Sequence, residues 1–313
     1  MIKKLIYLAI WMLAFSLSIF KIAEITQFRN YSFRRIKKRL ISDEEIMNIL
    51  RPRISQIRAV ILDYHGAMVK DLEEDYPPPE VYRELNYTLT KLPVFIVTDA
   101  RLSLLEEYFL THAPSNFIHW ENLFLYPWAG GAGYSIDREG KVNREKPFYY
   151  EPFVKGLEDE IKETIELFAQ IFGKEEVSNV LPKDGFRITL HLRSDTLRPP
   201  ELYAQYLNFF REKLSFYISR GELFITPSRK QGAIHFSSRN KARALDDILK
   251  RLRINRDNLL IVGDSPEDFI MHTPGMLTFN VGAMEDVPEG IYNLASKGPQ
   301  GLLKILGAIN KLK

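Results

Sequence analysis

The stretch that decides the fold reads AVILDYHG and spans residues 59–66 of the 313-residue chain. Four aliphatic residues in a row, without polar alternation, are typical of a strand covered on both faces, as in a parallel sheet. This strand delivers Asp63 to its carboxyl end, and Gly66 lets the backbone turn tightly three residues later. In open α/β sheets, ligands bind beyond the carboxyl ends of the strands. Asp63 is therefore the first candidate for a functional residue.

Three further apolar runs share this pattern, and each ends in a polar residue or a glycine. They are residues 94–97, which precede Thr98 and Asp99, residues 259–262, which precede Gly263 and Asp264, and residues 276–281, which precede Gly282. Amphipathic stretches with helical spacing lie between the runs, at residues 79–91, 102–112 and 240–252. Alternating buried strands and amphipathic helices predict an α/β fold built on a doubly wound parallel sheet.

Residues 150–229 have a different pattern. A strand at residues 185–193 alternates apolar and polar side chains, and a long amphipathic stretch lies on each side of it. This combination predicts a small, open-faced α+β domain inserted into the parallel one. We therefore expect a core domain of residues 57–149 and 230–313 and an inserted α+β domain of residues 150–229.

The N-terminus carries an uncharged apolar run at residues 5–20. Because a membrane span needs about 20 mostly apolar residues, we expect an anchor helix at residues 1–24, with membrane association through residues 5–23. Basic residues are more numerous after the run than before it, which predicts a membrane-anchored protein whose catalytic domain lies in the cytoplasm. A basic helical linker at residues 25–56 would follow, with Ser42 beginning a short helix. The alternative is a soluble cytoplasmic protein whose apolar helix packs on its own domain.

The composition limits the class of function. Hydrophobic residues make up 45% of the chain and charged residues 27%, which is typical of a globular protein with a sizeable core. The net charge is only +3, so nothing in the total favours a nucleic-acid partner. The chain has no cysteine, which excludes disulfides, thiolate metal sites and a cysteine nucleophile.

Two strand ends carry carboxylates suited to phosphoryl transfer. Asp63 can attack phosphorus to form an aspartyl-phosphate, and it can also bind Mg²⁺, which prefers hard oxygen ligands. Asp264 ends another buried strand, and Asp268 lies one helical turn later on the same face. Caps and helix N-terminal acids are the ordinary alternatives, but they do not explain why such acids recur at two strands. The sequence therefore predicts a magnesium site.

Thr98 and Lys241 supply the groups that a phosphate site needs. The Thr98 hydroxyl and the neighbouring backbone N–H groups, extending to Asp99, can form a cradle for a phosphate. Lys241 begins a helix after a strand and a loop, where its charge can neutralise a transferred phosphoryl group. A helix cap and a surface lysine are the alternatives, and the order of the residues along the chain argues against them.

That order resembles the haloacid dehalogenase (HAD) superfamily of phosphatases. Asp63, Thr98, Lys241 and Asp264 match its four motifs, and the resemblance covers about residues 57–310. The insert lies between the second and third motifs, as in members with a large α+β cap domain. The resemblance implies a HAD-like Rossmannoid core and Mg²⁺-dependent hydrolysis of a phosphomonoester.

Within that superfamily, the chain looks most like the trehalose-6-phosphate phosphatases. Their cap carries a strand that ends in His-x-Arg, and His191-Leu192-Arg193 occupies this place in the predicted strand. The resemblance implies that His191 and Arg193 bind the leaving group of a sugar phosphate. Both residues alternate onto one face of the strand, and the alternative is a face exposed to solvent.

His65 departs from the motif of the superfamily, which has a second aspartate two residues after the nucleophile. That aspartate is the general acid–base, and its backbone carbonyl is a metal ligand. We therefore expect His65 to bind Mg²⁺ through its main chain. Histidine can also act as a general acid–base near neutral pH, so His65 is a predicted catalytic residue.

The sequence thus predicts a Mg²⁺-dependent phosphatase acting on a sugar phosphate, such as a trehalose-6-phosphate-like substrate, or on another small phosphomonoester. The alternative is a catalytically weakened, membrane-tethered relative that binds a phosphorylated ligand or a protein partner. His65 and the apolar N-terminus motivate that alternative. A transferase or phosphomutase with the same aspartyl-phosphate is a third hypothesis.

Overall fold

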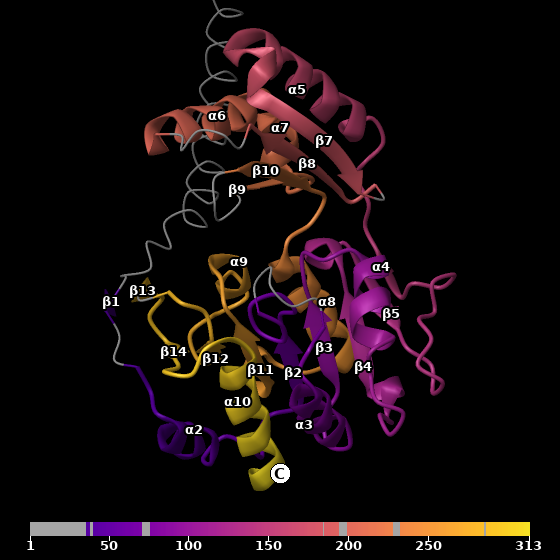
Figure 1. The fold of residues 1–313 in the computed structure, drawn as a ribbon, viewed down its shortest axis with the longest axis vertical. Coiled ribbons are helices and arrows are strands. Elements are labelled where there is room, and N and C mark those ends of the chain that lie inside the picture. The colour runs from indigo at the N-terminus through magenta and orange to yellow at the C-terminus, as the bar shows by residue number, and fades with distance from the viewer. Residues whose placement is uncertain are drawn as a thin grey trace, which may run out of the picture.

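The computed structural model describes residues 36–37, 40–70, 76–183, 185–193, 199–227, 232–284 and 286–313. In this part of the chain, the strands form a large mixed sheet, a smaller antiparallel sheet and a short two-stranded pair. Figure 1 shows the smaller sheet, with its own helices, as a separate unit beyond one end of the large sheet. The short pair joins β1 (Ile36–Lys37) to β13 (Asp286–Val287).

The large sheet has the strand order β14-β12-β11-β2-β3-β4-β5-β6. Every pairing from β14 to β4 is parallel, and the β4–β5 and β5–β6 pairings are antiparallel. Its strands are β2 (Ala59–Leu62), β3 (Val94–Val97), β4 (Leu123–Tyr126), β5 (Ala132–Ser135), β6 (Tyr149–Tyr150), β11 (Leu259–Gly263), β12 (Leu277–Asn280) and β14 (Ile291–Asn293). The predicted α/β fold with a mostly parallel central sheet is confirmed.

Helices cover both faces of this sheet, as expected for a doubly wound fold. Val60 and Leu62 pack toward α2 (Asp43–Leu50), α3 (Pro79–Leu89) and α10 (Gly298–Leu312). Ala59 and Ile61 point the other way, toward α8 (Lys241–Leu252). This alternation explains why the strand is apolar at every position: each of its faces has its own hydrophobic core.

Two short helices follow strands near the carboxyl edge of the sheet. After β3, α4 (Leu102–Leu104) continues as a π-helical turn over Leu105–Leu110. After β11, α9 (Pro266–Phe269) begins with a capping box between Ser265 and Asp268. Both connections therefore start directly beyond the strand ends that carry the predicted site residues.

The insert is an antiparallel sheet in the order β7-β8-β10-β9 with helices on one face. Its elements are α5 (Leu157–Phe172), β7 (Val177–Lys183), β8 (Arg187–Leu192), α6 (Pro200–Lys213), α7 (Ser215–Ser219), β9 (Phe224–Pro227) and β10 (Ala233–Ser237). Ile188, Leu190 and Leu192 of β8 pack into the core beneath its helices. Figure 1 shows the sheet between these helices and the large sheet, so the other face of β8 is turned toward the core.

The two chain segments that connect the insert to the core contact each other. The Arg239 guanidinium forms an ion pair with Glu151, and the Ser238 hydroxyl donates to the Glu151 carbonyl at 2.8 Å. Beside them, Phe186 of the insert stacks on Trp128 of the core, with ring centroids 4.7 Å apart. The insert is therefore held to the core by polar contacts at its crossings and by an aromatic stack.

Strand pairing corrects the predicted boundary of the insert. The prediction places residues 230–313 in the core, but β10 pairs with β8 and β9 of the insert sheet. In terms of strand pairing, the insert ends at Ser237.

The predicted membrane anchor is also corrected. Among the described residues, none of the helices is long and apolar enough to cross a membrane. This finding contradicts the predicted membrane-anchored localisation, and the N-terminal apolar helix at residues 1–24 lies outside the described residues. Of the linker at residues 25–56, the described part contains α2, which Ser42 caps as expected.

Candidate active site

Asp63 and Asp264 follow two adjacent parallel strands, β2 and β11. The chain leaves β2 toward β3 on one side and returns through β11 on the other, which makes this the switch point where ligands bind in open α/β sheets. Asp268 approaches from α9, and one carboxylate oxygen of each of the three residues lies within 4.8 Å of the others. All three residues are buried, so the structure gathers the three predicted carboxylates into one cluster.

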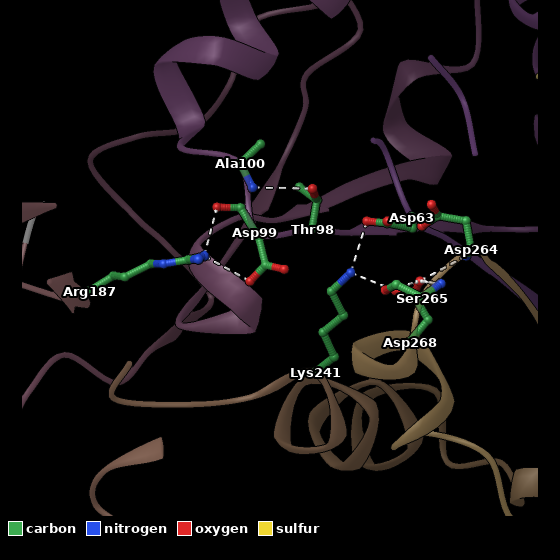
Figure 2. Close-up of polar contacts among 9 residues, drawn as sticks. All are labelled: Asp63, Thr98, Asp99, Ala100, Arg187, Lys241, Asp264, Ser265 and Asp268. Atoms are coloured by element: carbon green, nitrogen blue, oxygen red, sulfur yellow. Dashed lines mark hydrogen bonds and ion pairs between the residues drawn. The ribbon is translucent and has the colours of Figure 1, made fainter. Parts of the chain in front are cut away.

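Lys241 connects this cluster. It begins α8, is almost fully buried, and donates to Asp63 Oδ1 at 2.9 Å and to Asp268 Oδ1 at 2.6 Å. Figure 2 shows its ammonium group between the two carboxylates. Asn240 caps the helix by accepting from the Arg243 N–H, which fixes the first turn and hence the direction of the Lys241 side chain. A buried lysine of this kind is an internal cation of the site.

Burial and neighbouring charges shift the ionisation of the two partners. Burial raises the pKa of Asp63 well above its ordinary value, and the Asp268 and Asp264 carboxylates act in the same direction, while Lys241 opposes them. For Lys241, burial lowers the pKa, but the surrounding carboxylates outweigh it and raise the pKa well above its ordinary value. Lys241 is therefore protonated at neutral pH, but its single positive charge does not outweigh the burial and the two carboxylates that raise the pKa of Asp63.

Asp268 accepts hydrogen bonds from its neighbours in the cluster through both of its carboxylate oxygens. Its Oδ2 accepts from the Asp264 N–H at 2.9 Å, the Ser265 N–H at 3.1 Å and the Ser265 hydroxyl at 2.9 Å. Its Oδ1 accepts from Lys241. Because both oxygens already have donors, Asp268 orients Asp264 and Lys241, and Asp63 and Asp264 are better placed to serve as direct ligands of an ion.

Glycines allow the close packing around Asp264. Gly66 has a φ of +79°, and a Cβ added to it would stand 1.9 Å from Asp264 Oδ2. A Cβ added to Gly282 would stand 2.0 Å from the Asp264 carbonyl oxygen. No side chain fits at either position without moving Asp264, so the turn after β2 and the loop after β12 fix this aspartate from two sides.

Thr98 lies at the end of β3, the strand next to β2, and is buried. Its hydroxyl accepts from the Ala100 N–H at 3.2 Å, and its carbonyl accepts from the Ala129 N–H at 2.9 Å. Trp128 and Ala129 have φ values of 51° and 58°, in the left-handed region that costs non-glycine residues energy. This strained turn supports the Thr98 loop, and the sequence patterns did not predict it.

Asp99, a predicted substrate-binding residue, is engaged by the insert. Arg187 of β8 donates from Nη1 to Asp99 Oδ1 at 2.8 Å. Burial raises the pKa of the Asp99 carboxyl, but the charges of Arg187, Lys241 and His235 lower it to about 2. Asp99 is thus a negative charge on the core that faces the insert.

The remaining predicted residues lie at the edges of this arrangement. His65 sits in the turn after β2, which the Gly66 N–H closes by donating to the Val69 carbonyl at 2.9 Å. His65 is half-buried, and its ring lies edge-on to Tyr64 with centroids 5.1 Å apart. His191 is on β8 and Arg193 follows it, on the strand face that also carries Arg187.

The donor set fits Mg²⁺. Three carboxylates are hard oxygen ligands of the type that Mg²⁺ prefers. When all three are ionised, the ammonium of Lys241 compensates one of them, and two negative charges remain in a buried volume. A divalent cation neutralises this excess and favours the ionised form of Asp63. Asp63 and Asp264 are the groups of this cluster that would hold it.

Structural comparisons confirm the HAD-like fold that the motifs implied. The Plasmodium falciparum IMP-nucleotidase superposes with a TM-score of 0.59 at 14% sequence identity. The superposition covers 84% of this chain and 65% of the length of that enzyme. The C-terminal domain of Candida albicans trehalose-6-phosphate phosphatase superposes with a TM-score of 0.59 at 16% identity, covering 85% of this chain and 98% of that one.

A trehalose-6-phosphate phosphatase related protein has a TM-score of 0.50 at 15% identity, covering 81% of this chain and 97% of that one. No protein-family model matches this sequence, and no curated protein matches it either. The predicted likeness to HAD phosphatases, with trehalose-6-phosphate phosphatases among the neighbours, is therefore confirmed as a likeness of fold.

Arg187 is the main residue that the sequence analysis missed. It lies two and four residues before Thr189 and His191 on one strand face, so the alternation that places His191 and Arg193 on one face also includes it. The contact that buries this arginine against Asp99 could not be predicted from the sequence.

Proposed function

We propose that this protein is a Mg²⁺-dependent phosphatase that hydrolyses a small phosphomonoester, such as a sugar phosphate, through an aspartyl-phosphate. The observation that carries the proposal is the buried cluster in which Lys241 bridges Asp63 and Asp268 beside Asp264. Such a cluster costs folding energy, because buried charges are expensive even when paired. Its place beyond adjacent strand ends is where a phosphate ester would meet a nucleophile.

Each residue has a definite role in this proposal. Asp63 attacks phosphorus, and the ester bond to the leaving alcohol breaks as His65 gives that alcohol a proton. Thr98 and Lys241 hold the phosphoryl oxygens while their negative charge develops. Water then attacks phosphorus, His65 accepts its proton, and the bond to Asp63 breaks to release phosphate. Mg²⁺, held by Asp63, Asp264 and the His65 carbonyl, would compensate the charge on the phosphoryl group.

The insert acts as a cap in this proposal. Its sheet turns one face toward the core, and Arg187 of that face reaches Asp99, next to Thr98. His191 and Arg193 lie on the same face and would bind the leaving group. A cap in this position would limit the access of bulk water to a bound substrate.

The test is phosphate release from para-nitrophenyl phosphate and glucose 6-phosphate, measured with Mg²⁺ and with excess EDTA. The proposal expects release that requires Mg²⁺ and falls by several orders of magnitude in Asp63→Asn. Glu139→Gln, an exposed carboxylate in a loop of the core, is the matched control and should retain activity. Release that survives Asp63→Asn, or no release from any substrate, would refute the proposal.

A second candidate is a binding protein that holds a phosphorylated ligand without turnover. The histidine at position 65 favours it, because the acid–base aspartate implied by the HAD resemblance is absent from that position. His65→Asp separates the two. If the site has lost catalysis through this residue, the substitution raises turnover; if His65 is the working acid–base, turnover stays the same or falls.

A further inference from the structure

The face of the insert that is turned toward the core is basic. On β8 it carries Arg187, Thr189 and His191, because these residues alternate with the apolar ones that pack under the helices. On β10, His235 lies opposite Thr189, and its Nδ1 is 3.2 Å from the Thr189 hydroxyl. Among the described strand residues of this face, none is acidic, so its charge comes from Arg187, and the two histidines add ring nitrogens that can bond to a ligand.

Arg187 is the most constrained residue of this face. It is only 6% exposed, and its Nη1 donates to Asp99. Its Nε–H is buried and has no hydrogen-bond partner among the described atoms. Buried donors are almost always paired in folded proteins, and an unpaired one is costly. A guanidinium can only donate, so the group that satisfies Nε must offer an acceptor.

Asp99 shows which acceptor fits. Its carboxylate lies in the loop after β3, next to Thr98, with its side chain 42% exposed, and it already accepts from Nη1 of the guanidinium. It also adds to the charges that act on Lys241. An anion with two adjacent oxygens, a carboxylate or a phosphate, would offer the acceptors that a guanidinium prefers.

We propose that Arg187, with His235 and His191 on the same face, binds a second anionic group on the leaving group of the substrate. The preferred substrates are then phosphomonoesters that carry a carboxylate or a second phosphate, and not neutral sugar phosphates. Asp99 positions Arg187 over the site. This inference rests on the proposed phosphatase function, and it names the class of substrate.

Three probes that share a six-carbon chain test the inference. Glucose 6-phosphate has a neutral leaving group, 6-phosphogluconate adds a carboxylate, and glucose 1,6-bisphosphate adds a phosphate. The inference expects a kcat/KM for the better of the two anionic probes that exceeds the value for glucose 6-phosphate by about 10-fold to 100-fold, the effect of one or two charge-assisted hydrogen bonds. Whichever probe is better identifies the second anion.

Arg187→Gln should remove this preference, mainly through a higher KM for the anionic probe. Arg220→Gln is the control, because Arg220 is an exposed arginine of the insert that follows α7, outside the strands of this face, and pairs with Glu222. The preference should be unchanged in the control. Equal kcat/KM for the three probes, or a preference that survives Arg187→Gln, would overturn the inference while leaving the phosphatase function intact.

Binding to the Asp63→Asn protein keeps the two proposals separable. Calorimetric titration with the same probes measures affinity without turnover. If no probe is hydrolysed by the wild-type protein but the anionic ones bind about 10-fold more tightly or better, the phosphatase function fails and the anion subsite stands. If the three probes bind equally, or none binds, the subsite is refuted whatever the turnover shows.

Discussion

Replacing Gly66 by alanine measures how tightly the turn after β2 confines Asp264. A Cβ at this position would stand 1.9 Å from Asp264 Oδ2, so the carboxylate must retreat by about 1.5 Å to reach an ordinary contact of 3.4 Å. The Asp264 backbone cannot follow easily, because Gly282 approaches its carbonyl from the other side. Misplacement by about 1 Å of a group in a catalytic site costs on the order of 100-fold in rate.

The substitution also strains the backbone, and a control separates that effect from the clash. Alanine in the left-handed region costs about 1–2 kcal/mol, and Gly66 has a φ of +79°. Gly156, before α5, has a φ of +86°, and nothing lies within 4 Å of a Cβ added there. Both alanine variants should therefore carry similar backbone strain, while only Gly66→Ala also displaces the carboxylate.

The assays are calorimetric Mg²⁺ titration, phosphate release and urea unfolding of the two variants. We expect Gly66→Ala to bind Mg²⁺ more weakly and to lose about 100-fold in kcat/KM, while Gly156→Ala matches the wild-type protein in both. If the two variants bind Mg²⁺ and turn over equally well, Asp264 is not confined by Gly66 and is not a metal ligand.

Three further changes test the packing and charges around the site. Lys241→Met should lower the unfolding free energy measured in urea by about 3–5 kcal/mol, because it leaves buried carboxylates without their cation. The control Lys250→Met, at an exposed position of the same helix, should leave it almost unchanged. Equal losses in the two variants would contradict the buried bridge. The folded pKa of Asp99 is about 2 and the unfolded value about 3.9, so the stability that its pair with Arg187 contributes is present above pH 4 and is lost as the pH falls toward 2. The difference in unfolding free energy between wild-type protein and Asp99→Asn should shrink over that window, and a difference independent of pH would refute the pairing. Phe186→Ala removes the aromatic stack between insert and core and should lower the unfolding free energy, measured by thermal unfolding, by about 3–5 kcal/mol. A loss below about 1 kcal/mol would contradict the role of this stack in holding the insert to the core.

Much of the core could be predicted because strand ends and site residues coincide. A parallel strand covered on both faces must be apolar throughout, so the runs before Asp63, Thr98 and Asp264 were visible in the sequence. Their polar residues then had to lie at one edge of one sheet. The pairing of β2 with β11, which are far apart in the chain, is a tertiary feature that the periodicity of the runs does not show.

Other elements left weaker signals. The strand β7 reads VSNVLPK, and its proline and polar residues resemble a loop more than a strand. The helix α10 was not predicted, although Leu302, Ile305, Leu306 and Ile309 follow helical spacing. The left-handed turn at Trp128 and the contact between Arg187 and Asp99 depend on tertiary packing, which a single sequence does not reveal.

The central claim is that Asp63 is the nucleophile. The most direct measurement is to quench the protein with acid during turnover of para-nitrophenyl phosphate in Mg²⁺, reduce it with borohydride, and map its peptides by mass spectrometry. An aspartyl-phosphate at Asp63 is reduced to homoserine at that position, and EDTA should abolish this product. Homoserine at another aspartate, or none while phosphate is being released, would contradict the claim.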